Sequence, residues 1–327
     1  MTSELSLQNK SVLVTGGAGF VGSHLVDALI REKAGKIVVA SNFFLGSMDN
    51  LADAKINFPS LKIVRCDVAD YEEIRDVLTE NPVEVVFNLA VIPLPTSLVR
   101  PEWTIRKNID MTTNLCRLQR EGFFKTLIQY SSSEAYGSAK TIPMTEEHPH
   151  DPETPYAASK AATDFIALSY YHTFGQDIVV IRPFNQYGPR QNAKKYAGII
   201  PLVIGKILRG EVPVIYGDGE QTRDYLYVDD TIGGTLAAYK NPASRGKIIN
   251  IASGKEISIN YLVKKIAELM GYTGEIIYKE SRPGDVRRHV ADITLAKNLL
   301  GWQPVVSFEE GLHQTVEWYT KNKDLFS

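Results

Sequence analysis

Hydrophobic and polar positions follow two periods along the first half of the chain. Short apolar runs typical of buried strands lie at residues 11–14, 36–40, 61–66, 83–89, 126–130 and 178–181. Segments with apolar residues at helical spacing lie between them, including 21–30, 103–120 and 156–174. Strands that alternate with helices predict an α/β fold, a doubly wound parallel sheet with helices on both faces.

Three glycines follow the first predicted strand, before the first predicted helix. Gly16 allows a tight turn, Gly19 lets backbone approach a pyrophosphate, and Gly22 lets the helix pack closely on the strand. The start of the helix would offer unpaired N–H groups to the phosphates. The alternative is a glycine-rich turn without a ligand. Because strand, turn and helix follow in this order, we predict a dinucleotide site on a Rossmann-type sheet.

The end of the second predicted strand bears on which dinucleotide binds. An acidic residue there normally accepts a hydrogen bond from the adenosine ribose of NAD, but this chain has Ser41 and Asn42. No arginine stands there to pair with the 2′-phosphate of NADP. Ser41 or Asn42 can still bond a ribose hydroxyl, so we favour NAD. Asp67 and Val68 are expected at the adenine, with a turn residue that caps the next helix as the alternative for Asp67.

The remaining residues expected around the cofactor are Phe20, Val21, Leu89, Ala90 and Asn108.

A candidate catalytic pair lies near the middle of the chain. Thr154 and Pro155 are typical of a helix start, and Tyr156 and Lys160 then share one helix face. A free tyrosine, with a pKa of about 10, is a poor base at neutral pH. A nearby lysine cation and a positive nicotinamide would favour the phenolate, which could take a proton from a sugar hydroxyl. The alternative is a surface pair on an amphipathic helix.

A polar cluster follows the strand predicted at 126–130. Hydroxyls at the carboxyl end of a parallel strand face the ligand crevice, so one of them can bond the hydroxyl that Tyr156 deprotonates. Glu134 adds a carboxylate, either with a chemical role or as an acceptor for loop N–H groups.

After residue 183 the regular alternation of predicted strands and helices gives way to loops rich in Gly, Pro, Tyr and Arg. We expect a NAD-binding domain at 1–182 and a smaller, mixed α/β substrate domain at 183–327, with segments near 225–255 rejoining the first. Amide and arginine side chains recur there, at Asn185, Arg190, Arg223, Arg282, Arg287 and Arg288. Each arginine alone would be expected in a surface ion pair, but the set favours a diphosphate.

Two predicted helices are apolar over arcs wider than one sheet can cover. The residues concerned are Ile105, Ile109, Leu115 and Leu118 on the first helix, and Phe165, Leu168 and Tyr171 on the second. These arcs predict a homodimer through a four-helix bundle, and the alternative is burial under the chain's own C-terminal half.

Composition and charge limit the classes of partner that the protein could bind. The net charge is −2 without a basic block, which argues against nucleic acid, and no apolar stretch reaches membrane-spanning length. The first ten residues lack the apolar core of a signal peptide. Cys66 and Cys116 lack metal-ligand spacing, so we expect no metal and two reduced thiols in a cytoplasmic protein.

Taken together, the motifs resemble the extended short-chain dehydrogenase/reductase family, specifically its NAD-dependent nucleotide-sugar epimerases and dehydratases. The resemblance covers nearly the whole chain and rests on residues 15–23, 131–137, 155–160, 182–190, 216–230 and 282–288. It implies a UDP-, dTDP- or GDP-sugar, transient oxidation at C4 and usually a dimer. By position, Ser132 matches the catalytic Ser/Thr of the family. The residues expected at the substrate are Ser133, Asn185, Arg190, Arg223 and Arg282.

A few departures from the motifs of known subfamilies bear on which reaction this chain catalyses. The 4,6-dehydratases carry Thr-Asp-Glu where this chain has Ser132, Ser133 and Glu134. The aspartate that acts as the acid in those enzymes is therefore missing here. UDP-glucuronate decarboxylases carry Thr-Ser-Glu there, but also Arg-Lys-Pro-Asp where this chain has His-Val-Ala-Asp at 289–292. The loop at 91–97, with two prolines, is unlike most members and suggests an uncommon substrate or outcome.

We therefore expect an NAD-dependent nucleotide-sugar C4 epimerase that acts through a 4-keto sugar. The alternatives are a C4 dehydrogenase, a 4,6-dehydratase or a UDP-glucuronate decarboxylase of the same family. A further alternative is a non-catalytic NAD(P)-binding interaction protein. It is remote because such proteins often lose the tyrosine or the lysine, whereas this chain has both Tyr156 and Lys160.

Overall fold

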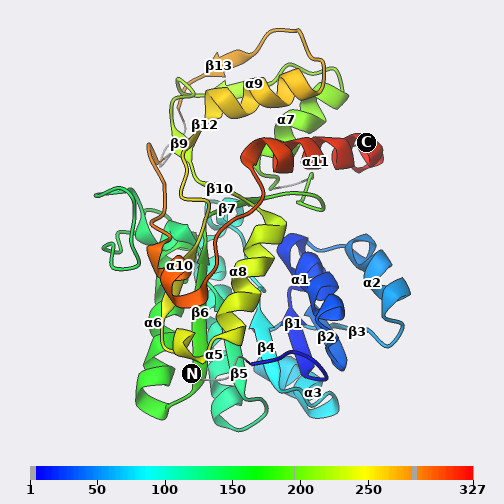
Figure 1. Cartoon of the computed structure of the whole chain (residues 1–327), viewed down its shortest axis with the longest axis vertical. Coiled ribbons are helices and arrows are strands. Elements are labelled where there is room, and N and C mark those ends of the chain that lie inside the picture. The colour runs from blue at the N-terminus through cyan, green and yellow to red at the C-terminus, as the bar shows by residue number, and fades with distance from the viewer. Residues whose placement is uncertain (1–4, 195, 282–285, 327) are drawn as a thin grey trace.

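A seven-stranded parallel sheet forms the centre of the computed structural model, which describes residues 5–194, 196–281 and 286–326. The strand order is β11-β6-β5-β4-β1-β2-β3 (Figure 1). The strands are β1 (Ser11–Thr15), β2 (Lys36–Ser41), β3 (Lys62–Arg65), β4 (Val85–Asn88), β5 (Thr126–Tyr130), β6 (Asp177–Pro183) and β11 (Ile248–Ile251). The order reverses at β1, and this switch point is where an open α/β sheet binds its ligand.

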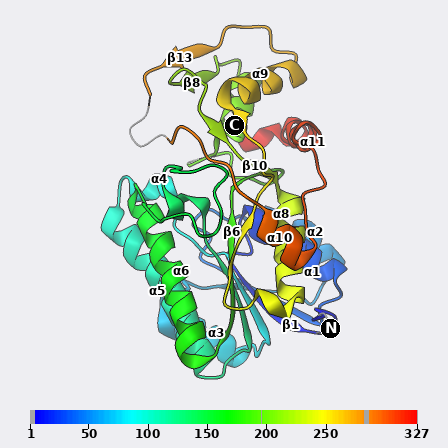
Figure 2. The same ribbon diagram turned by 60° about the vertical axis from the view of Figure 1, so that its left-hand side comes forward.

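Helices cover both faces of the sheet. One face carries α1 (Phe20–Arg31), α2 (Ala52–Asn57), α8 (Val228–Lys240) and α10 (Thr294–Leu300), whose apolar residues join one buried core. The other carries α3 (Tyr71–Glu80), α5 (Pro101–Arg120) and α6 (Pro155–Phe174) around a second core. Figure 2 shows α5 and α6 side by side along this second face. The predicted doubly wound sheet is therefore confirmed.

A smaller lobe lies above the carboxyl ends of the strands (Figure 1). Its helices and short strands are α7 (Ile199–Leu208), α9 (Ile259–Leu269), α11 (Phe308–Lys321), β7 (Asn185–Tyr187), β8 (Val214–Tyr216), β9 (Thr222–Arg223), β10 (Tyr225–Tyr227), β12 (Ile257–Ser258) and β13 (Ile277–Lys279). They enclose a separate apolar core around Ile204, Leu262 and Leu312. The chain crosses between the lobes several times, because α8, β11 and α10 lie on the sheet.

The shorter helices are α4 (Leu94–Ser97) and the single turns η1 (Met48–Leu51), η2 (Ser133–Tyr136), η3 (Pro242–Ser244) and η4 (Lys323–Phe326). Among the described residues, no helix combines the length and the apolar character that a membrane span requires.

The apolar arcs of α5 and α6 are covered by the chain itself to a larger extent than the sequence suggested. Leu115 and Leu118 are fully buried, and Leu168 and Tyr171 pack against the same core. Leu115 and Leu118 therefore cannot contribute to an intersubunit face, because α5 and α6 pack on each other as well as on the sheet, while the four-helix bundle itself stays a prediction. Phe165 differs, since 58% of it is exposed.

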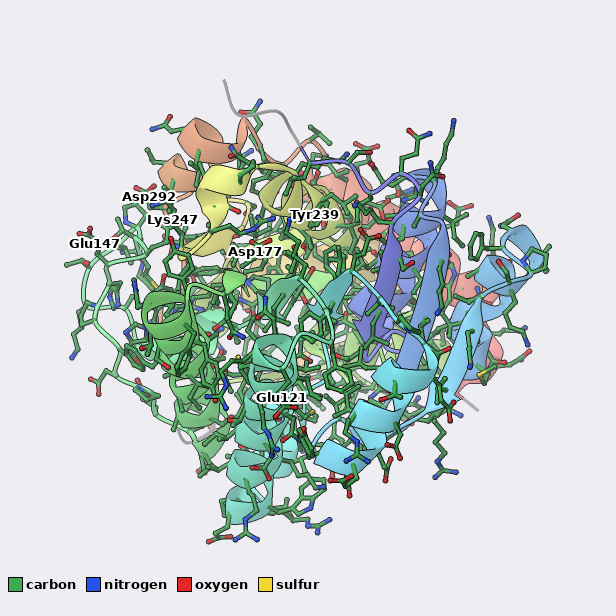
Figure 3. All side chains as sticks on the ribbon, turned by 90° about the horizontal axis from the view of Figure 1, so that it is seen from below. Glu121, Glu147, Asp177, Tyr239, Lys247 and Asp292 are labelled. Carbon is green, nitrogen blue, oxygen red and sulfur yellow. The ribbon has the colours of Figure 1, made fainter. Side chains whose placement is uncertain are left out.

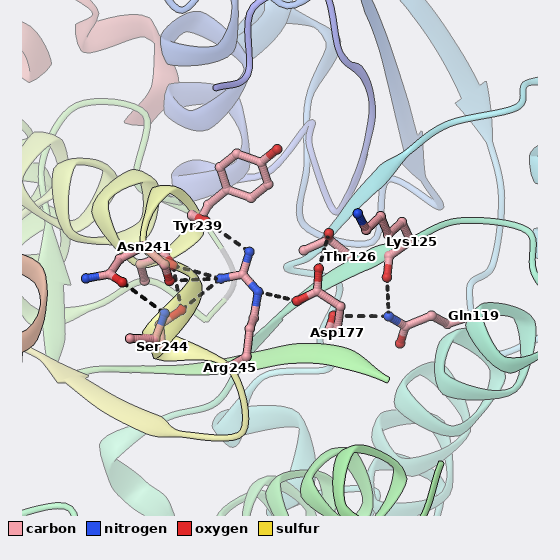
Figure 4. A network of polar contacts seen from close by, with 10 residues as sticks. Gln119, Lys125, Thr126, Asp177, Tyr239, Asn241, Ser244 and Arg245 are labelled. Carbon is pink, nitrogen blue, oxygen red and sulfur yellow. Dashed lines mark hydrogen bonds and ion pairs between the residues drawn. The ribbon is translucent and has the colours of Figure 1, made fainter. Parts of the chain in front are cut away.

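The lower edge of the sheet, where the strands begin, is closed by a polar network around Arg245. Its guanidinium donates to the carbonyls of Ala238, Tyr239 and Asn241 and pairs with the Asp177 carboxylate. Asp177 also accepts from the Thr126 hydroxyl (2.6 Å). Figure 4 shows the network, and Figure 3 shows Asp177 and Tyr239 on the same side of the molecule. It ties the starts of β5 and β6 to the end of α8.

Candidate active site

A cavity of about 430 Å³ opens at the carboxyl ends of the sheet strands. Its wall includes Gly16 after β1, Ser41 at the end of β2, Ala90 after β4 and Ser131 after β5. Its size falls within the usual range for small-molecule sites, about 300–1,000 Å³. The strand ends meet there because all seven strands run in the same direction.

The glycine turn is shaped to hold a diphosphate. Gly16 has a positive φ of 66°, and a Cβ on Gly22 would lie 2.3 Å from the Gly16 carbonyl oxygen. A side chain at Gly22 would therefore push the helix away from the turn, and a Cβ on Gly16 would lie 3.0 Å from the backbone of Leu89 and Ala90. α1 begins after Gly19, and no side chain caps the N–H groups of its first turn. The residues of that turn, Phe20, Val21 and Gly22, line the cavity. These residues fit the diphosphate of a dinucleotide.

Ser41 and Asn42 also line the cavity, and each fixes the loop after β2. The Ser41 hydroxyl accepts from the Phe43 N–H (3.1 Å), and the Asn42 side-chain carbonyl accepts from the Phe44 N–H (3.0 Å). Phe43 is held at a φ of 58°, a conformation that glycine or asparagine adopts more easily.

Asp67 and Val68 lie on the same wall. Asp67 accepts from the Ala69 N–H (3.1 Å) and pairs with Lys107 (2.7 Å). The expected alternative for Asp67, a turn residue, is therefore correct in part, but the helix cap is Asp70. Asp67 both shapes the turn and faces the cavity.

Leu89 and Ala90 line the cavity, whereas Asn108 is buried beside it. The Asn108 side chain accepts from the Ile92 N–H (2.8 Å) and donates to the Ile92 carbonyl and the Ser159 hydroxyl. Its place fits a brace that holds the loop after β4 against α6, and a direct contact with the cofactor remains a prediction.

The start of α6 sets the candidate catalytic pair. Thr154 caps the helix by accepting from the Ala157 N–H (3.1 Å), and Pro155 is the first helical residue, as predicted. Tyr156 and Lys160 then both line the cavity. The Lys160 ammonium, 4% exposed, donates to the Tyr130 carbonyl at the end of β5 (2.5 Å).

Burial shifts the pKa of both Tyr156 and Lys160. Burial raises the pKa of Tyr156 to about 12, and the Glu134 charge acts in the same direction, while a hydrogen bond with Ser132 lowers it. Burial lowers the pKa of Lys160 to about 8, against the opposing charge of Asp164. Lys160 is not among the groups that shift the pKa of Tyr156, since its ammonium donates to the Tyr130 carbonyl, and the stabilisation of the phenolate by Lys160 together with a bound nicotinamide stays a prediction.

The polar cluster after β5 forms the turn η2. The Ser132 hydroxyl accepts from the Glu134 N–H (3.2 Å) and also meets the Tyr156 phenol. Ser133 is buried, and Glu134 lies half-buried in the same turn. The structure therefore brings Ser132, Glu134 and Tyr156 together, as the resemblance implies.

The predicted substrate residues are only partly gathered. Arg190 lines the cavity while paired with Asp27 (2.7 Å), and Asn185 stands beside Gln186, which lines it. Arg223 donates to the Thr222 and Val286 carbonyls. Arg282 lies outside the described residues.

Two arginines leave the expected diphosphate set. Arg287 pairs with Asp218 (2.8 Å) and Arg288 with Glu256, both at the surface. For them the ordinary surface ion pair is the correct interpretation.

Several lining residues were missed by the sequence analysis: Phe44, Leu45, Gly46, Met111, Tyr130, Ser131, Gln186, Gln191, Asn192 and Tyr196. Phe44 and Tyr196 stack across the cavity with their rings 6.5 Å apart. Aromatic residues in loops carry no helical or strand period, so no local signal pointed to this contact.

Comparisons with known proteins agree with this geometry. The family model described as GDP-mannose 4,6 dehydratase matches residues 13–315. A putative UDP-glucose 4-epimerase of Methanocaldococcus jannaschii is 35% identical over 315 residues, which cover 95% of this chain and 99% of that protein.

Two solved structures support the same assignment. A Thermotoga maritima UDP-glucose 4-epimerase with UDP-glucose has a TM-score of 0.90 at 35% identity, covering 96% of this chain and 99% of that one. A dTDP-glucose 4,6-dehydratase of Streptomyces venezuelae with NAD bound has a TM-score of 0.89 at 30% identity, covering 96% and 98%. Sequence, fold and site together show that the chain belongs to the NAD-dependent nucleotide-sugar epimerase/dehydratase family of extended short-chain dehydrogenases/reductases.

Proposed function

We propose that the protein is a nucleotide-sugar C4 epimerase that uses NAD. The observation that carries the proposal is that Tyr156 and Lys160 line the cavity and Ser132 bonds the Tyr156 phenol, without an acidic residue at position 133. Relatives that catalyse 4-epimerisation support it through their similarity over nearly the whole chain.

The chain's own residues supply the proton chemistry. Tyr156 takes the proton of the sugar 4-hydroxyl, and the Ser132 hydroxyl donates to the same sugar oxygen. Lys160 is the cation that the protein itself provides, and with a pKa of about 8 it is mostly protonated at pH 7. The glycine turn and the start of α1 would hold NAD, which would supply hydride-transfer chemistry at the sugar C4.

Inversion requires the 4-keto sugar to turn in its pocket before the hydride returns. Val91, Ile92, Pro93 and Met111 form an apolar stretch of the cavity wall. Such a wall offers few hydrogen bonds to a sugar ring, and it therefore favours rotation over a fixed pose.

The direct test is the product formed from a panel of UDP-, dTDP- and GDP-sugars, analysed by mass and proton NMR. We expect one substrate to give a product of unchanged mass with inverted C4 coupling. A product lighter by water, carbon dioxide or two hydrogens would overturn the epimerase in favour of a dehydratase, a decarboxylase or a dehydrogenase.

Glu134 supports a second candidate, in which the 4-keto sugar reacts further. A carboxylate beside Tyr156 is placed to remove a proton from the neighbouring C5, as in a 4,6-dehydratase. Glu134→Gln separates the two candidates, with the exposed Glu147→Gln as a matched control. Retained epimerisation would make Glu134 structural, whereas loss of turnover with continued cofactor reduction would favour chemistry at C5.

We also infer that two chains associate through α5 and α6 into a homodimer with a four-helix bundle. Support comes from apolar side chains on this side of the molecule: Leu98 (65% exposed), Val99 (75%) and Phe165 (58%). Phe165→Glu should convert the protein to a monomer in light scattering coupled to gel filtration. A dimer that survives this change would contradict the inference.

We expect the enzyme to work in the cytoplasm. Cys66 and Cys116 are both free and buried, and burial raises the pKa of each thiol to about 12. Unpaired, unreactive thiols are typical of a reducing compartment.

A further inference from the structure

The loop after β2 contains donors of hydrogen bonds where a carboxylate would normally hold the ribose. The oxygens of the Ser41 and Asn42 side chains are occupied by backbone N–H groups of the same loop. Their free hydrogen-bonding capacity is therefore the Ser41 O–H and the Asn42 NH₂. Both residues line the cavity. A pair of donors suits an anion at least as well as a ribose hydroxyl.

The neighbouring strand adds a cation that is distant in sequence. In the parallel pairing of β2 with β3, Arg65 is the partner of Ser41, and adjacent strands lie about 4.8 Å apart. Val39 and Ile63 are also partners, and both pack into the core on the α1 face. Because side chains alternate along strands, Ser41 and Arg65 project on that same face.

Arg65 is exposed just outside the residues that line the cavity, and none of the ion pairs between described residues includes it. An aspartate at position 41 would stand directly beside this guanidinium and neutralise it. With a serine there, the guanidinium remains available to a ligand at the end of β2.

The carboxylates near this end of the cavity are Asp67, which lines it, and Glu73, which accepts from the Asp67 N–H (2.8 Å) and belongs to α3 on the other face of the sheet. Among the described residues that line the cavity, Asp67 is the acidic one, and its carboxylate is paired with Lys107 at 2.7 Å. A bound anion would thus meet Arg65 and two neutral donors, with no unpaired carboxylate in the described wall.

We propose that Arg65, Ser41 and Asn42 form a site for the 2′-phosphate of NADP, so that the protein binds NADP as well as NAD. A planar guanidinium can bond a phosphate in bidentate fashion, and an arginine near this strand end is how dinucleotide folds accommodate the 2′-phosphate. The proposal concerns the adenosine end of the cofactor. It stands independently of the proposed epimerisation, because it does not depend on which sugar reacts.

The test measures binding of NADH and NADPH separately, by nucleotide fluorescence and calorimetry, without any sugar. We expect the two dissociation constants to lie within about tenfold of each other at low ionic strength, with NADPH binding the more sensitive to salt. Binding of NADPH more than about 100-fold weaker than that of NADH would overturn the proposal.

Two substitutions sharpen the test. Arg65→Gln should weaken NADPH about tenfold or more and leave NADH within about twofold, because only the 2′-phosphate bonds the guanidinium. Lys62→Gln, an exposed cation at the other end of β3, is the matched control and should change neither. Equal weakening of both nucleotides by Arg65→Gln would contradict the assignment.

Ser41→Asp makes the opposite change. The new carboxylate should strengthen NADH through the ribose hydroxyl and weaken NADPH by about 100-fold through repulsion and by neutralising Arg65. Unchanged preference in this variant would show that the loop does not read the ribose, and would overturn the proposal.

Discussion

The two ends of the central sheet, where the strands begin and where they finish, carry partly buried clusters of charged and hydroxyl side chains that differ in how well their charges are matched. At the lower edge, Arg245 and Asp177 are surrounded by backbone carbonyls and hydroxyls that complete their hydrogen bonds (Figure 4). At the upper edge, Tyr156 and Lys160 face a cavity, and burial shifts the pKa of each in the direction that favours the neutral side chain.

The difference shows what separates a structural polar cluster from a chemical one. The lower cluster stabilises the fold because each charge is matched within the chain. The upper cluster holds groups that the fold alone leaves poorly matched, so that a ligand must complete their environment. Residue type by itself does not distinguish the edges, since both use charged and hydroxyl side chains.

The largest expected effect comes from removing the phenol at the upper edge. Tyr156→Phe deletes one oxygen and should lower turnover by about 10²–10⁴-fold, because the sugar hydroxyl loses its proton acceptor. The melting temperature should be unchanged. Steady-state kinetics on the substrate identified by NMR measures the effect, and near-full activity would reject Tyr156 as the base.

At the lower edge the same kind of change should act on stability alone. Arg245→Met leaves Asp177 without its cation and several carbonyls without donors, and should reduce the free energy of unfolding by about 2–4 kcal/mol. Urea unfolding gives the value, while kcat at low temperature should stay near that of the wild type. A large loss of kcat in the still-folded variant would remove the distinction between the edges.

Lys160 should show the opposite sign from Arg245. The pKa of Lys160 is lowered in the folded state, so below pH 8 the folded protein holds a buried ammonium away from water. In the unfolded chain the same charge is solvated by water and carries no such cost. Lys160→Met should therefore raise the unfolding free energy at pH 7 by about 1–3 kcal/mol while it impairs catalysis. This gain should shrink as the pH rises from about 8 toward 10.5, where the wild-type lysine loses its charge in both states. A variant that is destabilised at pH 7 would show that Lys160 is structural.

The smallest effect concerns the start of the catalytic helix. Thr154→Ala removes the cap bond to the Ala157 N–H and should reduce stability by about 1 kcal/mol. Thr154→Ser keeps the hydroxyl and is the control. An effect on kcat much larger than on stability would mean that the cap also sets the position of Tyr156.

Much of this site could be predicted from the chain alone. The glycine turn, the capped helix with Tyr156 and Lys160, and the strand-end hydroxyl Ser132 are local patterns, and each lies where it was expected. Parallel strands bring their carboxyl ends together, so local position along the chain translates directly into position at the cavity.

Other residues resisted prediction because their roles depend on partners far away in sequence. The side-chain hydrogen bonds of Asn108 join the loop at Ile92 to Ser159, and Arg287 meets Asp218 across 69 positions. A sequence shows that an arginine is present but not which carboxylate lies beside it. For the same reason Arg65 escaped notice, since only the register of β3 against β2 places it next to Ser41.

The sequence by itself determined the order of strands and helices, the dinucleotide turn and the catalytic pair, because these follow from periodicity, backbone freedom and helix capping within a few residues. Only the tertiary structure decided which charges are matched and how far burial shifts the pKa of Tyr156 and Lys160. Desolvation and strand register are properties of the packed chain, and neither exists until distant segments come into contact.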